Sequence, residues 1–146
     1  MNLNTGAATL IANVGGAGSI AQNIYGTVYI ANNNSTGNLK TVDVNTGIVT
    51  NGPAFVGYAY GGPVKALAFH GITDQLYGIF PAPGNAGADS NFVLINTATG
   101  LVGTVGSITS AGVALSIDAL AITPFACIHG SSLISLADGT TVPIRD

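Results

Sequence analysis

The chain has 146 residues, of which 47% are hydrophobic, enough for one domain with a core of its own. Charged residues make up 6% of the chain, against about a quarter in an average soluble domain, so its surface repels neighbouring molecules weakly. The three basic residues are too few to neutralise a row of phosphates, which excludes nucleic acid as a partner: Lys40, Lys65 and Arg145.

Membrane insertion and secretion leave no clear signal in the sequence. Gly, Asn and Thr interrupt every apolar run before it reaches the roughly 18 residues that a membrane-spanning helix needs. We therefore expect no membrane insertion, and the first residues lack the basic region of a standard signal peptide. Asn33 and Asn34 each begin a glycosylation sequon, whose use depends on a secretory route that the sequence does not establish.

Three similar turn sequences occur along the chain: "NTGA" at 4–7, "NTGI" at 45–48 and "NTATGL" at 96–101. Residues typical of β-strands follow each of them, in "ATLIANV" (8–14), "IVTNGPAFV" (48–56) and "LVGTVGSI" (101–108). The glycines of these turns, Gly6, Gly47 and Gly100, are predicted to take a positive φ in tight hairpins. Their spacing indicates a repeat of about 40 residues, lengthened once by the insertion "PAPGNAGADS".

A full unit of this repeat contains four predicted strands in chain order. They are "ALAF" (66–69), "LYGI" (76–79), "VLI" with the turn "NTATG" (93–100), and "LVGTVGSI" (101–108). Similar residues occur earlier, in "NIYGTVYIA" (23–31) and "LKTVDVNTGIVT" (39–50), where Leu39, Val42 and Val44 are predicted to be half-buried. They also occur later, in "SIDALAITPFACIHGSSLI" (116–134). The run at 112–124 has a helix-like composition but fits a strand pair as well.

Residues 1–124 resemble the blades of bacterial and viral β-propellers, which carry "LYGI…INTATG" signatures. We therefore predict an all-β fold of two to three propeller-blade-like antiparallel sheet units, packed as a sandwich or completed by oligomerisation. A closed propeller contains about four to eight blades, and a smaller set exposes sheet edges. The shortage of blades and the shortage of charges both predict self-association.

The chain changes character at Cys127, and "CIHGSSLISLADGTTVPIRD" resembles the first block of the Hint superfamily, the self-processing modules of inteins and hedgehog-type proteins. The resemblance divides the chain into a repeat domain at 1–126 and a segment at 127–146. It implies that Cys127 is a catalytic nucleophile that attacks the carbonyl of Ala126. That reaction also needs a downstream histidine block that is not found in this sequence, and His129 lies too far along its strand to replace it. The alternative is a terminal hairpin with a turn at residues 138–139.

No other constellation of residues indicates a catalytic or metal site. His70, His129 and Cys127 do not have the spacing of zinc ligands, so we expect no metal and no cofactor. The aspartates are dispersed rather than grouped as in a calcium loop; Asp43 and Asp118 are predicted on exposed strand faces, and Asp74 and Asp89 in loops. The five tyrosines suit either core packing or contact with glycans or a second subunit: Tyr25, Tyr29, Tyr58, Tyr60 and Tyr77.

These observations favour a structural protein that assembles with copies of itself into a fibre, shell or surface layer, at a virion surface or outside the cell. Two alternatives are open. The chain is the front part of a precursor that is cleaved between Ala126 and Cys127, or it is a propeller fragment that binds carbohydrate or protein.

Overall fold

The computed structural model describes residues 5–32, 37–59, 62–82, 90–122, 133–135 and 141–143. Within these ranges all regular structure is strand, so the predicted all-β class is confirmed. None of the described residues forms a helix able to cross a membrane. The strands are β1 (Ala17–Gln22), β2 (Val28–Asn32), β3 (Asn38–Val42), β4 (Val49–Ala54), β5 (Ala66–Phe69), β6 (Leu76–Pro81), β7 (Ser90–Ile95), β8 (Val102–Ser107), β9 (Thr109–Ser110), β10 (Val113–Ala114), β11 (Leu133–Ser135) and β12 (Thr141–Pro143).

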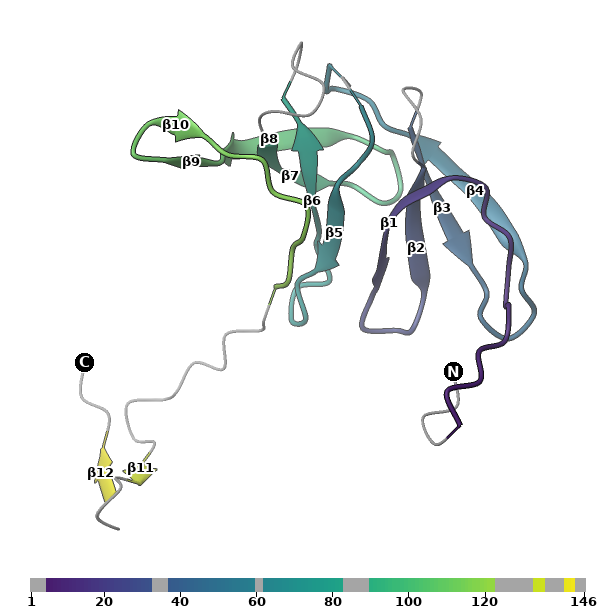
Figure 1. Ribbon diagram of the computed structural model, residues 1–146, viewed down its shortest axis with the longest axis horizontal. Helices are drawn as coiled ribbons and strands as arrows, with labels where there is room; N and C mark the ends of the chain where they lie inside the picture. Colours follow the sequence, from purple (N-terminus) through teal and green to yellow (C-terminus); the bar gives the residue numbers. More distant parts are fainter. Residues whose placement is uncertain are drawn as a thin grey trace.

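Two four-stranded antiparallel sheets form the body of the molecule (Figure 1). Blade 1 contains β1 to β4 and blade 2 contains β5 to β8, and in each sheet every strand pairs with the next one in the chain. The four strands predicted from the repeat unit are those of blade 2, in the predicted order. Short antiparallel connections produce this arrangement, because hairpins join neighbouring strands directly.

The turn glycines have the predicted backbone conformation. Gly47 lies between β3 and β4 with φ +73°, and Gly100 lies between β7 and β8 with φ +74°. In each turn the residue at the end of the third strand accepts two backbone N–H groups on its side-chain oxygen: Asp43 from Asn45 and Thr46, and Asn96 from Ala98 and Thr99. Because the side-chain oxygen accepts the backbone N–H groups of the turn, these groups need no partner on a neighbouring strand. The same turn therefore forms at both places.

Two segments that were predicted as strands differ in the structure. Residues 8–14 contain no strand, because a strand needs a neighbour to pair with and no described strand pairs with them. Of residues 112–122, only β10 is paired, with β9, through a two-residue turn in which Ala111 and Gly112 have positive φ. Val44 was also predicted to be half-buried, but it lies in the β3–β4 turn and is 43% exposed.

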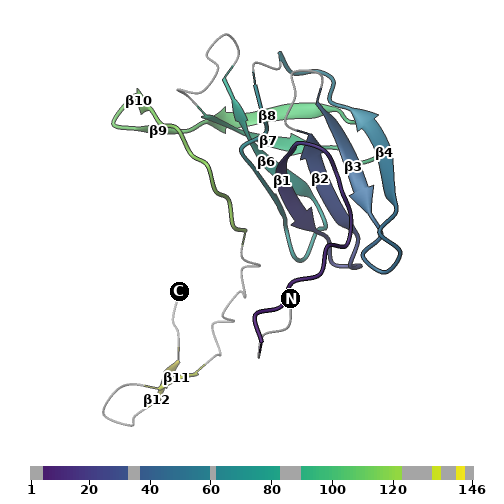
Figure 2. The ribbon, with the colours of Figure 1, turned by 45° about the vertical axis from the view of Figure 1, so that its right-hand side comes forward.

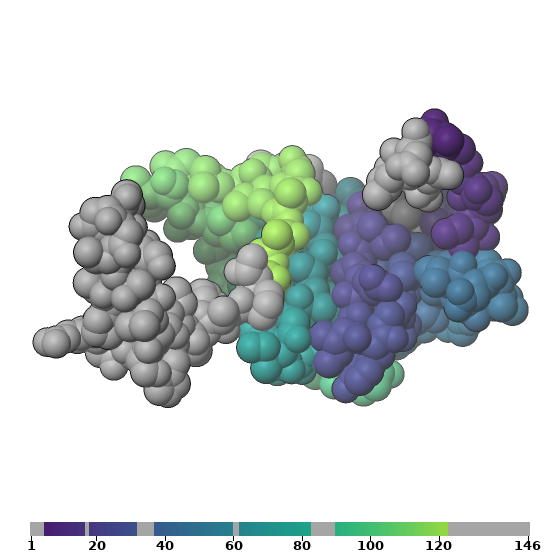
Figure 3. Space-filling view, turned by 90° about the horizontal axis from the view of Figure 1, so that it is seen from below, coloured from purple at the N-terminus to yellow at the C-terminus, as the bar shows by residue number. Residues whose placement is uncertain are grey.

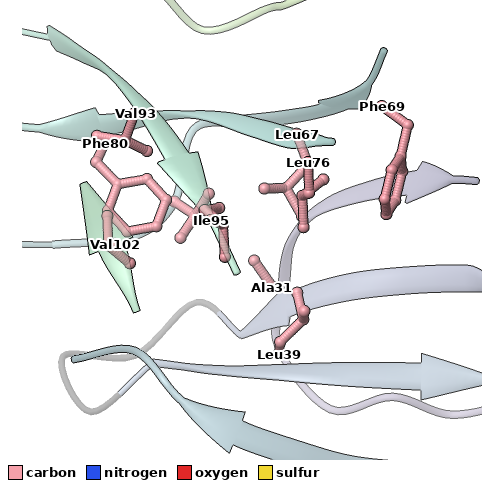
Figure 4. Packing of buried hydrophobic residues seen from close by; sticks show 10 residues of the cluster. Ala31, Leu39, Leu67, Phe69, Leu76, Phe80, Val93, Ile95 and Val102 are labelled. Atoms are coloured by element: carbon pink, nitrogen blue, oxygen red, sulfur yellow. The ribbon is translucent and has the colours of Figure 1, made fainter. Parts of the chain in front are cut away.

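The main apolar core lies between the two blades (Figure 4). Ala31 and Leu39 of blade 1 face the buried side chains of blade 2, and Tyr29 of blade 1 packs on Phe69 with their ring centroids 5.1 Å apart. The blade 2 side of this core is made of one face of the sheet together with Val64: Val64, Leu67, Phe69, Leu76, Phe80, Val93, Ile95 and Val102. The two sheets therefore bury their facing sides against each other, and one side of each blade remains outside this core (Figure 2).

A smaller cluster covers the outer face of blade 1. Val28, Ile30 and Val42 are buried there beneath Ala12 and Val14, which come from the segment before β1. Lys40 donates a hydrogen bond from Nζ to the carbonyl oxygen of Val14, 3.2 Å away. Residues of the chain's own beginning thus cover part of a sheet face that would otherwise be exposed.

Candidate functional site

The predicted nucleophile lies outside the described residues. Cys127, His129 and the scissile carbonyl of Ala126 all belong to residues 123–132. Further along the segment at 127–146, β11 pairs antiparallel with β12, with Ile134 opposite Val142. Both a Hint-like beginning and a terminal hairpin contain a strand pair, so this pairing does not separate the two interpretations. Processing at Cys127 stays a prediction, and so do the sequons at Asn33 and Asn34.

His70 stabilises a turn. It follows β5, and its Nδ1 lies 3.2 Å from the backbone N of Thr73 and 3.1 Å from the hydroxyl of Thr73. Asn23 takes the equivalent place in blade 1, where its Oδ1 accepts hydrogen bonds from the backbone N–H groups of Tyr25 and Thr27. Among the described residues no three His, Cys, Asp or Glu side chains come close enough together to hold a metal ion.

The described aspartates have structural contacts, and two of them differ from the prediction. Asp43 is exposed, as predicted, but it closes a turn, and the hydrogen bonds from the backbone N–H of Asn45 and from Thr46 lower the pKa of its carboxyl group. Asp118 is exposed but lies outside any strand, with its carboxylate 3.7 Å from the Nζ of Lys65. Asp74 lies in the β5–β6 turn, as predicted, and Asp89 falls outside the described residues.

Asp74 connects the two blades. It has a positive φ of 53°, which is uncommon for a residue with a side chain. Its carboxylate oxygens lie 3.3 Å from the backbone N of Ile24 and 3.4 Å from the side-chain N of Asn23, both in the β1–β2 turn of blade 1. An aspartate at this position therefore joins two neighbouring turns across the blade boundary.

Most of the described tyrosines pack against aromatic neighbours. Tyr29 contacts Phe69, Tyr58 lies edge-on to Phe80, and Tyr77 stacks on Phe92 with an interplanar angle of 5°. Burial raises the pKa of Tyr58, whose hydroxyl donates to the carbonyl oxygen of Pro81 and accepts a hydrogen bond from Asn91. Tyr25 is 79% exposed, and Tyr60 lies outside the described residues.

Each blade has a shallow hollow between the turn that joins its first two strands and the turn that joins its last two strands. The hollow of blade 2 measures about 420 Å³ and that of blade 1 about 440 Å³. Their linings contain residues from equivalent positions, such as Asn96 and Asp43 at the ends of the third strands, and Leu101 and Ile48 after the turns. A hollow that recurs in each blade follows from the blade's shape, so neither one indicates a particular ligand.

The outer face of blade 2 repeats the positions by which blade 1 contacts blade 2. In blade 1 these are Tyr29, Ala31 and Leu39, which lie on one face of β2 and β3. The residues at the same register in blade 2 are Tyr77, Ile79 and Phe92, because Tyr77 lies opposite Ala68 and Leu94 as Tyr29 lies opposite Ala21 and Thr41. The outer face of blade 2 therefore repeats the positions that bind a blade, but Ile79 is 1% exposed, so part of this face is already covered within the chain.

Lys65 anchors the residues that follow blade 2, at 115–118, to the outer face of that blade. Its side chain is 9% exposed, and its Nζ lies 2.6 Å from Ser116 Oγ and 3.7 Å from the carboxylate of Asp118. Buried Ser90 adds two contacts, because its N–H donates to the carbonyl oxygen of Leu115 and its hydroxyl accepts from the N–H of Ile117. These contacts were not predicted from the sequence. The signal that could have found them is the presence of Lys40 and Lys65 in a chain with so few charged residues, because each lysine ties a flanking segment to a blade.

Comparison with known proteins supports the fold. No protein-family model and no curated protein matches the chain. The chain is similar to the solved structure of the PQQ-bound aldose sugar dehydrogenase from Streptomyces coelicolor, a β-propeller, with a TM-score of 0.52 and 17% sequence identity. The similarity covers 72% of this chain and 34% of the dehydrogenase, so the chain spans about a third of that protein's length. At this identity the likeness shows a propeller-like fold alone.

Proposed function

We propose that this chain is a structural β-sheet subunit that assembles with copies of itself into a shell, fibre or surface layer, at a virion surface or outside the cell. The observation that carries the proposal is the set of exposed apolar side chains around the two blades, in a chain of which 6% of the residues are charged. The outer face of blade 2 also repeats the apolar positions by which blade 1 contacts blade 2, although Ile79 on that face is already buried.

The exposed residues support association. Thirteen large hydrophobic side chains are exposed among the described residues, and several lie on or beside blade 1, including Leu10 at 84% and Ile20 at 63%. Exposed apolar groups on a surface with few charges lower the cost of bringing two molecules together, since burying them releases water and little charge repulsion opposes the contact. Each blade also has two edge strands, β1 and β4 in blade 1 and β5 and β8 in blade 2, and natural proteins seldom leave such edges bare.

Sedimentation of the full chain across a wide concentration range tests the proposal. Ile20 lies on β1 opposite Ile30, on the outer face of blade 1, and Ile72 is equally exposed, at 65%, but lies in the β5–β6 turn away from the blade faces. We expect assemblies for the wild type and for Ile72→Asp, and at least a tenfold weaker association for Ile20→Asp. A wild-type chain that is monomeric at every concentration would contradict the proposal.

A further inference from the structure

The segment before β1, residues 5–14, begins like the fourth strand of a blade, and we name it the N-terminal flank. Gly6 has φ +69°, and the backbone N–H of Ala7 donates to the hydroxyl of Thr5 over 3.3 Å. Residues 46–48 and 99–101 have the same two features, with φ +73° and +74° and with N–H to hydroxyl distances of 3.3 Å. Those two turns lead directly into β4 and β8, the fourth strands of the blades.

The N-terminal flank also ends as a fourth strand does. The carbonyl of Ile11 passes so close to Gly47 that a side chain there would collide with it, and the carbonyl of Ala54, at the end of β4, passes Gly100 in the same way. Ala12 and Val14 then pack on blade 1, as Phe55 and Tyr58 pack on blade 2 after β4. The path from a fourth strand to the next blade is thus repeated at the beginning of the chain.

What this flank lacks is a third strand beside it. No described strand pairs with residues 7–14, and Leu10 and Ile11 are 84% and 55% exposed. A fourth strand in either blade is held by a ladder of backbone hydrogen bonds to the third strand. The N-terminal flank therefore has the geometry of a strand that ends a blade, and none of the described strands completes that blade.

The segment after blade 2, residues 115–122, begins like a first strand, and we name it the C-terminal flank. The backbone N–H of Phe55 donates to the carbonyl oxygen of Gly37 as the chain leaves blade 1, and the N–H of Ile108 donates to that of Ser90 as it leaves blade 2. Lys65 follows Phe55 at the same spacing as Asp118 follows Ile108. Each of these two residues, Lys65 and Asp118, is followed by the sequence "ALA". At 66–68 that sequence lies in β5, the first strand of blade 2. The C-terminal flank thus occupies the place where a third blade starts.

Building on the proposed self-assembly, we propose that copies of this chain join head to tail by sharing a blade. The C-terminal flank of one copy begins the shared blade, and the N-terminal flank of the next copy supplies its fourth strand. The partner is a second copy of this chain because the two flanks, which lie on opposite sides of the blade pair (Figure 3), resemble the first and the last strand of one blade. In chain order β11 and β12 follow the C-terminal flank as an antiparallel pair, as β6 and β7 follow β5, and they supply the two middle strands.

Such a contact is heterologous, and it closes into a ring when the rotation between blades allows. Each copy contributes two complete blades, and each junction between copies adds one shared blade. Closed propellers contain about four to eight blades. Two copies with a shared blade at each junction form a ring within this range, so the expected unit of the larger assembly is a closed dimer.

The matched variants Leu10→Asp and Val105→Asp test the shared blade in the full chain. Leu10 lies in the N-terminal flank, whereas Val105 is 57% exposed on β8, a fourth strand that already has its partner. Both side chains are exposed, so neither substitution disturbs the packing within one copy. We expect the smallest assembled species of wild type and Val105→Asp to be a dimer of twice the 14.4 kDa of the chain, and Leu10→Asp to raise the dimer dissociation constant at least tenfold.

Hydrogen exchange of the peptide that covers residues 5–12 gives the second measurement. Its amides should become protected as wild-type dimer forms and should stay unprotected in Leu10→Asp. Association with no protection of this peptide and no effect of Leu10→Asp would overturn the shared blade while leaving self-assembly intact. A chain that stays monomeric at every concentration would overturn both.

Discussion

Gly100 and Gly112 have nearly the same backbone conformation, with φ +74° and +79°, but different surroundings. A Cβ at Gly100 would collide with the backbone of Ala54 as the chain leaves blade 1, whereas a Cβ at Gly112 would meet nothing within 4 Å. We expect Gly112→Ala to cost about 1–2 kcal/mol for the left-handed backbone alone. Gly100→Ala should cost about 1–3 kcal/mol more, because the overlap forces the two blades apart. The free energy of unfolding in urea measures both, and equal losses would show that the close approach contributes nothing.

The residues that close the turns show which roles residue type alone can predict and which it cannot. Asn23, Asp43, His70 and Asn96 each follow a strand and accept backbone N–H groups in the next turn. Asn96 was recognisable as a turn former from sequence, since its short side chain reaches the backbone two residues on, whereas Asp43 was predicted on a strand face. His70 was not recognisable as a turn former, because an imidazole is equally suited to metal binding or catalysis, and only its position after β5 assigns it to the turn.

At the scale of elements, the two flanks depend on one lysine each. Lys65 holds residues 115–118 through Ser116 and Asp118, and Lys40 holds the N-terminal flank through the carbonyl of Val14. In Lys65→Met we expect amide exchange of residues 115–118 to accelerate about tenfold, because a hydrogen bond to a charged group contributes roughly 1.5–3 kcal/mol before the exposure of Asp118 reduces it.

The matched variant Lys40→Met should act on the other side of the molecule. It should accelerate exchange in the N-terminal flank and leave residues 115–118 unchanged. If residues 115–118 keep their protection in Lys65→Met, then Ser90 alone anchors the C-terminal flank.

At the scale of the whole molecule, the blades share one core. Leu39 belongs to blade 1 and is 1% exposed, yet it packs in the cluster that contains Phe69 and Leu76 of blade 2. Leu39→Ala should cost about 2–5 kcal/mol, as truncation of a buried leucine does. Because the cavity opens between the sheets, protection against hydrogen exchange should fall in β6 and β7 as well as in blade 1. Val42→Ala, in the outer cluster of the same blade, is the control, and a loss confined to blade 1 in Leu39→Ala would mean that the blades unfold separately.

The body of the fold could be predicted from the sequence, and its flanks could not. Alternating apolar residues and the "TG" turns predicted β5 to β8 in order, because hairpins and half-buried strands are formed by neighbours in the chain. "ATLIANV" has the same composition but is no strand, since pairing requires a second strand that the sequence of the segment cannot provide. The candidate catalytic residue, Cys127, lies outside the described residues, and the assembly surfaces were expected only in general terms.

The sequence by itself determined the all-β class, the turns and the low charge of this protein, because these follow from residue type and short-range spacing. Only the tertiary structure decided which faces of the blades are buried. A period-two strand pattern marks two faces but does not say which neighbour covers each, and here one face of each blade meets the other blade while the opposite faces meet the flanks. The physical reason is that burial depends on contacts between residues far apart in the chain, such as Lys65 with Ser116 and Lys40 with Val14, and these exist only in the folded chain.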